Sequence, residues 1–79
     1  MSDEILPPLT ETRKGQYRHY KGLRYEVIAT VRHSETLEPM TLYRALYGER
    51  GLWVRPAAMF EEAVVVNGVR EPRFTWISE

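Results

Sequence analysis

The sequence contains no cysteine, which excludes disulfide bonds and thiolate metal sites and leaves the redox compartment open. It also lacks a long apolar run. The longest, residues 57–60 and 63–66, have four residues each, whereas a membrane-spanning helix needs about 20. Residues 1–4 are acidic and have no apolar stretch, so we expect no secretory signal. These absences favour a soluble cytoplasmic protein with no membrane partner.

The chain is short, and this limits what its apolar residues can do. Its 79 residues predict one small domain, whose core typically supplies only about 3–5 kcal/mol of net stability. We therefore expect most large apolar side chains to serve folding. Residues 1–14 include Pro7-Pro8 and have no strand or helix pattern, so they predict a flexible tail before a single domain at residues 15–79.

Net charge is zero, but the charges are unevenly spread. Residues 13–32 hold six basic residues against one acidic residue, a sum of +5. Residues 1–12 sum to −3 and residues 33–79 to −2. Such asymmetry can mark a surface for an anionic partner.

Apolar and polar residues alternate along several short segments, as they do in β-strands. The clearest alternation covers residues 23–32, and shorter strands are expected at residues 16–20, 40–47, 52–55 and 73–77. Asn67-Gly68 lies between two valine-rich segments and suits the two positive φ angles of a type I′ hairpin turn. Residues 57–62 allow only a 3₁₀ or single helical turn. The pattern predicts an all-β fold, a small barrel of about five strands or a strongly bent sheet.

Many spaced motifs run in order along residues 15–74. They are Gly15-x-Tyr17-x-His19-Tyr20-Lys21-Gly22, Tyr25-x-Val27, His33-Ser34-Glu35-Thr36, Tyr43-x-Ala45-Leu46-Tyr47-Gly48, Leu52-Trp53-Val54-Arg55-Pro56, Met59-Phe60 and Pro72-Arg73-Phe74. In these motifs the chain resembles the small bacterial family called domain of unknown function 1653. The resemblance implies a compact SH3-like β-barrel. It implies no established activity, cofactor or catalytic residue.

Polar, aromatic and basic residues gather in three segments, which we take as the candidate ligand-binding surface. Its residues are Arg18, His19, Tyr20, Lys21, His33, Ser34, Glu35, Thr36, Trp53 and Arg55. His19 either faces a ligand or is a half-buried histidine bonded to the backbone. Trp53 and Arg55 form a platform for a planar or anionic ligand if Leu52 and Val54 enter the core. Otherwise Trp53 covers the end of the barrel and Arg55 pairs with a glutamate.

Besides a binding role, the 33–36 segment allows two further interpretations. His33, Ser34 and Glu35 supply a base, a hydroxyl and a carboxylate, but no nucleophile elbow surrounds Ser34. The alternative is a turn in which the hydroxyls of Ser34 and Thr36 bond nearby backbone amides. The two histidines with a glutamate could in principle form a zinc site, but no ligand motif is present and we predict no metal and no cofactor.

One strand leaves its buried face undecided. At residues 40–47, Tyr43 and Tyr47 share one face, and Met40, Leu42 and Leu46 share the other with an arginine. Inward tyrosines are ordinary core, whereas outward tyrosines could stack a base or a proline.

The composition and the candidate surface favour a noncatalytic binding module for a nucleotide or single-stranded nucleic acid, held by stacking and charge. The first alternative is a protein–protein adaptor that uses the tyrosines and Trp53. The third hypothesis is a small hydrolase centred on the 33–36 loop. We predict no catalytic residue, and the natural partner is left open.

Overall fold

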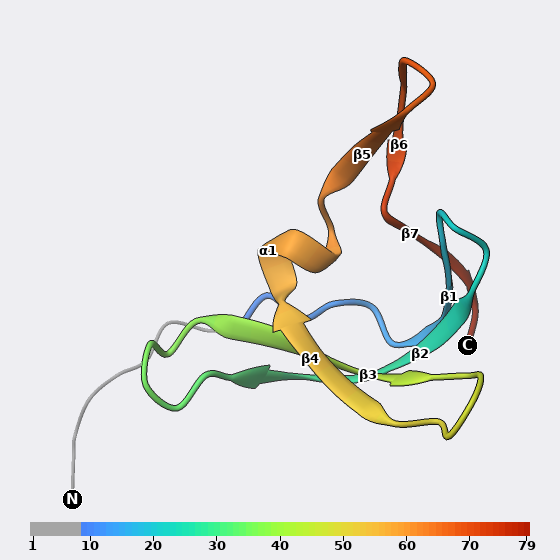
Figure 1. The fold of residues 1–79 in the computed structure, drawn as a ribbon. Helices are drawn as coiled ribbons and strands as arrows, with labels where there is room; N and C mark the ends of the chain where they lie inside the picture. The colour runs from blue at the N-terminus through green and yellow to red at the C-terminus, as the bar shows by residue number, and fades with distance from the viewer. Residues whose placement is uncertain (1–8) are drawn as a thin grey trace, which may run out of the picture.

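The computed structural model describes residues 9–79, which form seven strands and one short helix (Figure 1). The elements are β1 (Gly15–His19), β2 (Arg24–Arg32), β3 (Pro39–Ala45), β4 (Leu52–Pro56), α1 (Ala57–Phe60), β5 (Ala63–Val66), β6 (Val69–Pro72) and β7 (Phe74–Ser78). The all-β prediction and the single helical turn are confirmed. No helix within residues 9–79 is long or apolar enough to cross a membrane.

Five strands form one antiparallel sheet in the order β4-β3-β2-β1-β7, and β5 and β6 form a separate hairpin. The predicted closed barrel is wrong, because no ladder among residues 9–79 joins the edge strands β4 and β7. Pro56 ends β4 and leads directly into α1, which packs against β3 and β4. The helix thus lies over the inner side of the open, bent sheet (Figure 1).

The strand signals in the sequence correspond closely to the observed elements. The alternating segment is β2, and a bulge at Ile28 shifts its register against β3 between Val27 and Ala29. Asn67 and Gly68 have φ of 51° and 77°, so the predicted type I′ geometry joins β5 to β6.

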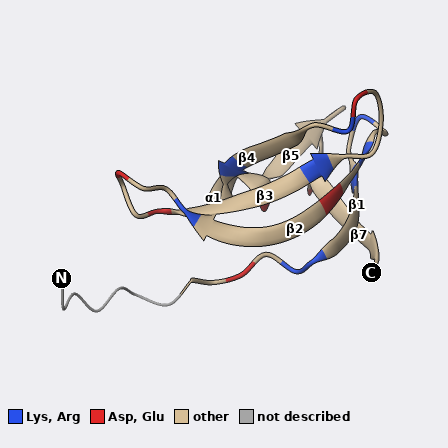
Figure 2. Cartoon of the chain, turned by 90° about the horizontal axis from the view of Figure 1, so that it is seen from below, with Lys and Arg blue, Asp and Glu red and all other residues tan. Residues whose placement is uncertain are grey.

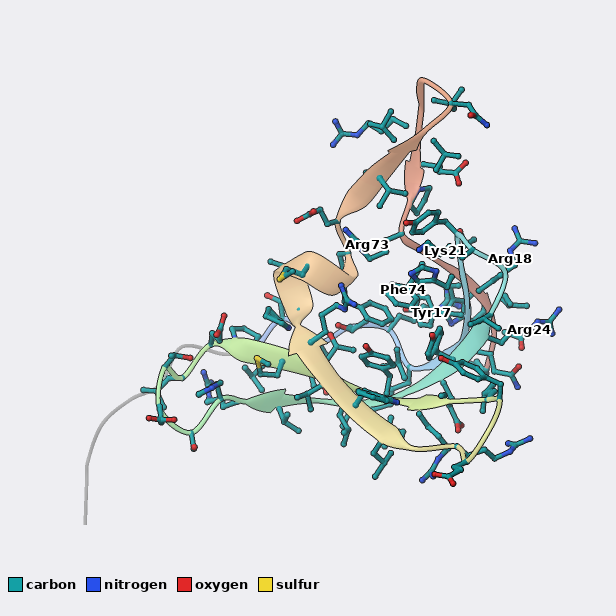
Figure 3. The ribbon with its side chains drawn as sticks, in the orientation of Figure 1. Tyr17, Arg18, Lys21, Arg24, Arg73 and Phe74 are labelled. Atoms are coloured by element: carbon teal, nitrogen blue, oxygen red, sulfur yellow. The ribbon has the colours of Figure 1, made fainter. Side chains whose placement is uncertain are left out.

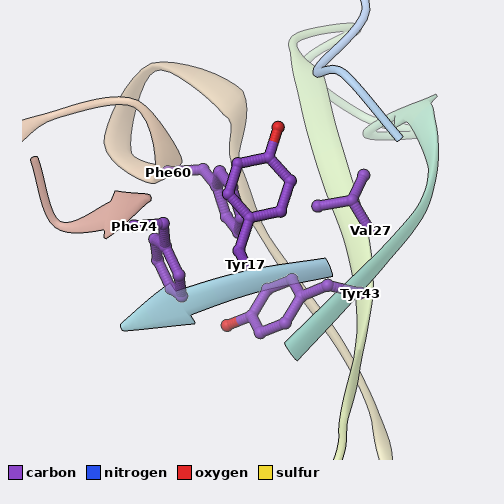
Figure 4. Close-up of a cluster of buried hydrophobic side chains, with 5 residues drawn as sticks. All are labelled: Tyr17, Val27, Tyr43, Phe60 and Phe74. Atoms are coloured by element: carbon purple, nitrogen blue, oxygen red, sulfur yellow. The ribbon is translucent and has the colours of Figure 1, made fainter. Parts of the chain in front are cut away.

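An aromatic cluster fills the inside of the bend (Figure 4). Tyr17 of β1, Val27 of β2, Tyr43 of β3, Phe60 of α1 and Phe74 of β7 make up this cluster, and Phe60 is 1% exposed. The rings of Phe60 and Phe74 stack in parallel, 4.0 Å between centroids and 4° between planes. The four rings therefore join β1, β3, α1 and β7 in one core.

The cluster decides which face of β3 is buried. Thr41, Tyr43 and Ala45 are buried on the inner face, although Met40 at the strand's start is buried as well. Of the two alternatives for this strand, Tyr43 follows the one in which the tyrosines enter the core. Tyr47 lies beyond the end of the strand and is exposed.

The segment before β1 contributes to packing at one residue. The side chain of Thr12 is buried, its backbone N–H donates to Thr30 Oγ1 at 2.8 Å, and its hydroxyl bonds the Thr41 hydroxyl at 2.7 Å. Thr12, which we assigned to the tail, is therefore packed against β2 and β3. Residues 1–8 of the predicted tail fall outside the described residues.

Replacement of Phe60 by alanine should destabilise the domain by about 3–5 kcal/mol, because it removes a fully buried ring and leaves a cavity between four elements. A loss of this size equals the whole stability expected of so small a core, so Phe60→Ala should be largely unfolded by circular dichroism. Met59→Ala, at an exposed position on the same helix, should change the urea midpoint little. Equal effects of the two substitutions would contradict this account of the core.

Candidate functional site

The inner face of the sheet carries a group of aromatic rings that runs from the core out to solvent. Cross-strand pairs fix their positions, because Tyr43 lies opposite Trp53 and Tyr25 lies opposite Ala45. Tyr25, Tyr43, Tyr47 and Trp53 line a hollow of about 210 Å³, which we call the tyrosine hollow. Trp53 is 58% exposed at its rim. A flat ring therefore lies open to solvent beside a wall of tyrosine rings.

Tyr25 links the tyrosine hollow to the core. Its ring contacts those of Tyr43 and Phe74 edge-on, at centroid distances of 5.4 and 5.6 Å, and that of Tyr47 at 5.6 Å. Its hydroxyl bonds the Tyr47 hydroxyl at 2.8 Å. Burial, followed by this hydrogen bond, raises the pKa of Tyr25 to about 12. The phenol is therefore neutral at physiological pH.

His19 is held at the end of β1 by a tight turn. Its backbone N–H donates to the Leu23 carbonyl and its carbonyl accepts from Gly22 N–H, both at 2.7 Å. Gly22 has a φ of 102°, a backbone conformation that residues other than glycine rarely adopt. The centroid of the His19 ring lies 4.6 Å from that of the Tyr20 ring and 4.9 Å from that of the Phe74 ring. Its Nδ1 accepts from the Lys21 N–H at 3.2 Å, which leaves Nε2 as the nitrogen that can meet a ligand.

The positive charges of three side chains act on His19. Burial of the ring lowers the pKa of His19 first, and the positive charges of Arg73, Lys21 and Arg55 lower it further. The His19 ring centroid lies 6.2 Å from that of Tyr25, and Arg55 follows Trp53 on the same face of β4, so this group borders the tyrosine hollow. We call His19, Lys21, Arg55 and Arg73 the His19 cluster.

The cations of the His19 cluster are only partly neutralised. Arg73 Nη2 lies 3.6 Å from Glu62 Oε1, but its Nε is buried and has no hydrogen-bond partner among the described residues. Neither Lys21 nor Arg55 forms an ion pair with any carboxylate of residues 9–79. Thus the expected glutamate partner of Arg55 is not found there. The charges of Lys21 and Arg55 therefore remain available to stabilise an anion.

Backbone bonds fix Arg73 in this position. Its carbonyl accepts from the Tyr20 N–H at 2.9 Å, and its N–H donates to the Glu62 carbonyl at 3.1 Å. Figure 3 shows Arg73 and Phe74 on the inner side, between α1 and β1.

Arg18 lies on the other face of the sheet, since neighbouring residues in a strand point to opposite sides. It pairs directly with Arg24, and both side chains are exposed and project outward (Figure 3). Arg18 therefore does not join the other predicted residues of its segment, namely His19, Tyr20 and Lys21.

The 33–36 loop is also remote from the tyrosine hollow. It follows β2, whose nine residues extend for about 30 Å away from Tyr25, and it lies at the opposite end of the sheet (Figure 2). His33 Nδ1 accepts from the N–H groups of Glu35 and Thr36 at 3.1 and 3.3 Å. The Thr36 hydroxyl accepts from the Glu38 N–H at 3.3 Å.

These bonds favour the interpretation of this segment as a structural turn over a catalytic role. His33 follows the end of β2 and His19 lies beside its start, so the two histidines are too far apart to share a metal. Among residues 9–79 no group of three histidine or carboxylate side chains is arranged to hold a metal ion.

Of the predicted ligand residues, the structure brings together His19, Tyr20, Lys21, Trp53 and Arg55. Sequence reasoning omitted Arg73, Tyr25, Tyr43 and Tyr47 from the predicted site. The tyrosines were visible as one face of alternating strands, whereas nothing in the sequence near Arg73 links it to His19.

The burial of His19 and the positive charges near it predict that stability depends on pH. Because the folded-state pKa of His19 is below that of the unfolded chain, the unfolded chain binds the proton first as pH falls. Stability should therefore be unchanged above about pH 6.5 and decrease as pH falls from there to the folded-state pKa. His19→Gln should remove this decrease, measured by urea denaturation at several pH values.

A second measurement tests the cause of the shift. Lys21→Gln removes one of the cations and should raise the pKa of His19 in an NMR titration. Arg70→Gln removes an exposed charge on β6 and is the matched control, expected to leave the His19 titration in place. An unchanged titration in Lys21→Gln would contradict the electrostatic account.

Comparisons with known proteins place this geometry in a family. The family described as "Protein of unknown function (DUF1653)" matches residues 15–76. The crystal structure of a protein belonging to DUF1653 from Bordetella bronchiseptica is 33% identical in sequence, with a TM-score of 0.78, covering 85% of this chain and 88% of that one. A search of curated proteins found no match. The chain therefore belongs to the DUF1653 family.

Proposed function

We propose that the inner face is a noncatalytic binding site for a ligand that combines a planar ring with negative charge, as a nucleotide or single-stranded nucleic acid does. The observation that carries the proposal is the position of the His19 cluster beside the tyrosine hollow. Stacking surface and positive charge are the two features with which proteins hold single strands without reading their sequence.

The two parts of the site have separate tasks. The exposed ring of Trp53 and the tyrosine wall offer a surface on which a base stacks, and the tyrosine hydroxyls can bond its polar edge. Lys21, Arg55 and Arg73 attract phosphate, and neutral His19 offers Nε2 as a hydrogen-bonding group.

The size of the tyrosine hollow favours an extended ligand. Its volume of about 210 Å³ lies below the roughly 300 Å³ typical of sites that enclose a small molecule. A base fits such a hollow, while the attached sugar and phosphate stay outside it. A single strand, which passes over an open surface, suits this shape better than a free nucleotide that needs enclosure.

The adaptor is the second candidate, since a tyrosine and tryptophan wall also suits a proline-rich peptide. The His19 cluster argues against it, because such a peptide needs no phosphate-binding charge. The hydrolase hypothesis has the least support, since His33 bonds the backbone of its own turn. The proposal includes a cytoplasmic location, since nucleotides and single-stranded nucleic acids occur there. It also includes a fold related to SH3-like barrels, which the antiparallel order of the bent sheet supports.

The proposal is tested by amide chemical-shift titration of the labelled protein with random single-stranded oligonucleotides, mononucleotides and a peptide pool, each at two salt concentrations. We expect oligonucleotide shifts at Lys21, Trp53, Arg55 and Arg73, with affinity falling steeply as salt rises. Shifts caused by peptides alone, independent of salt, would favour the adaptor. Shifts confined to the 33–36 loop, or none at all, would overturn the proposal.

Two variants separate stacking from charge in this assay. Trp53→Ala should cost about 1–3 kcal/mol, between roughly fivefold and over a hundredfold in affinity, because it removes a stacking ring. Arg55→Ala should reduce both the affinity and its salt dependence. Arg18→Ala removes the same charge from the outer face and is the matched control, which should retain more affinity than Arg55→Ala.

A further inference from the structure

The edge strand β4 presents unpaired backbone groups to solvent. The Ala45 N–H donates to the Gly51 carbonyl at 3.1 Å. Because every second residue of an antiparallel strand bonds the same neighbour, the backbone groups of Trp53 and Arg55 also point towards β3. The N–H and C=O groups of Leu52 and Val54 therefore point away from the sheet. No strand of the described part of the chain covers them.

The side chains of this edge are unusually apolar for an exposed strand. Leu52 and Val54 are each 54% exposed on the outer face, and Trp53 is exposed on the inner face. Proteins normally protect edge strands with lysine, bulges or covering segments. β4 has none of these within its first three residues, and only Pro56, at its end, interrupts the row of donors.

We propose that β4 pairs antiparallel with β4 of a second copy of this chain, around a two-fold axis at Trp53. In this register Leu52 lies opposite Val54 of the second copy, and the reverse. Each such pair exchanges two hydrogen bonds, so the outward N–H and C=O groups of both residues are satisfied in both copies.

The same register matches the side chains. The two Trp53 rings meet as a non-hydrogen-bonded pair, the position at which side chains lie closest, and Leu52 meets Val54 on the outer face. Pro56 lies outside the paired residues, so its missing N–H costs no bond. The chain has no net charge, so two copies do not repel one another. These features favour a second copy over an unrelated partner strand.

A short strand edge buries little surface, below the range of about 1,200–2,000 Å² that stable complexes use. The dimer should therefore be weak and concentration-dependent. Pairing would join the two sheets and place two tyrosine hollows next to each other on one face.

The first test is sedimentation equilibrium of the full chain over a wide concentration range. We expect a reversible shift from 9.3 kDa towards twice that mass. Leu52→Lys and Val54→Lys should each weaken dimerisation by about tenfold or more, because the dimer then holds two added charges at an apolar contact. Val65→Lys, at an exposed valine of the β5–β6 hairpin, should leave it unchanged. A single 9.3 kDa species at every concentration, or equal effects of all three, would overturn the proposal.

The absence of native cysteine allows a test of the register. Non-hydrogen-bonded partners lie about 4.5 Å apart between Cα atoms, within the range of a disulfide, whereas diagonal neighbours lie about 7–8 Å apart. Trp53→Cys should therefore cross-link between copies under mild oxidation much faster than Val54→Cys or Val65→Cys. Faster cross-linking of Val54→Cys would show a different register, and equal rates at all three sites would show random collision; either result contradicts the proposed pairing.

Discussion

The parallel stack of Phe60 on Phe74 is the contact on which the rest of this structure depends. It joins the only helical turn of the described residues to strand β7, which is at the far edge of the sheet from β4. Tyr17 and Tyr43 pack against Phe60 from the strands between, at centroid distances of 5.2 and 5.5 Å. A sheet that no ladder among residues 9–79 closes is thus held in its bend by rings from four elements. With so small a core, few other side chains can replace them.

Stability and the proposed binding site use the same aromatic network. Tyr25 contacts Tyr43 and Phe74 in the core and Tyr47 in the tyrosine hollow, so the wall of the hollow is the outer boundary of the core. Side chains held by packing lose little conformational freedom when a ligand binds. A shallow hollow with such a wall can therefore hold a ring without enclosing it.

Strand alternation separates the positive charges into two groups. Arg18 and Arg24 oppose one another on the outer face, where like charges lower the stability of the pair. The inner group joins Lys21 of the β1–β2 turn to Arg55 and Arg73, which come from much later in the chain. The basic segment seen in the sequence therefore supplies only one of the three cations around His19.

The sequence by itself determined the strand positions, the single helical turn, the Asn67-Gly68 hairpin and the family. These follow from local rules, because a period of two and a pair of positive φ angles need only neighbouring residues. Only the tertiary structure decided that the sheet stays open, that Tyr43 enters the core, that Trp53 remains exposed and that Arg73 lies near His19. An alternating strand has two faces, and which one is buried depends on what packs against it, here Phe60 from an element that comes later in the chain.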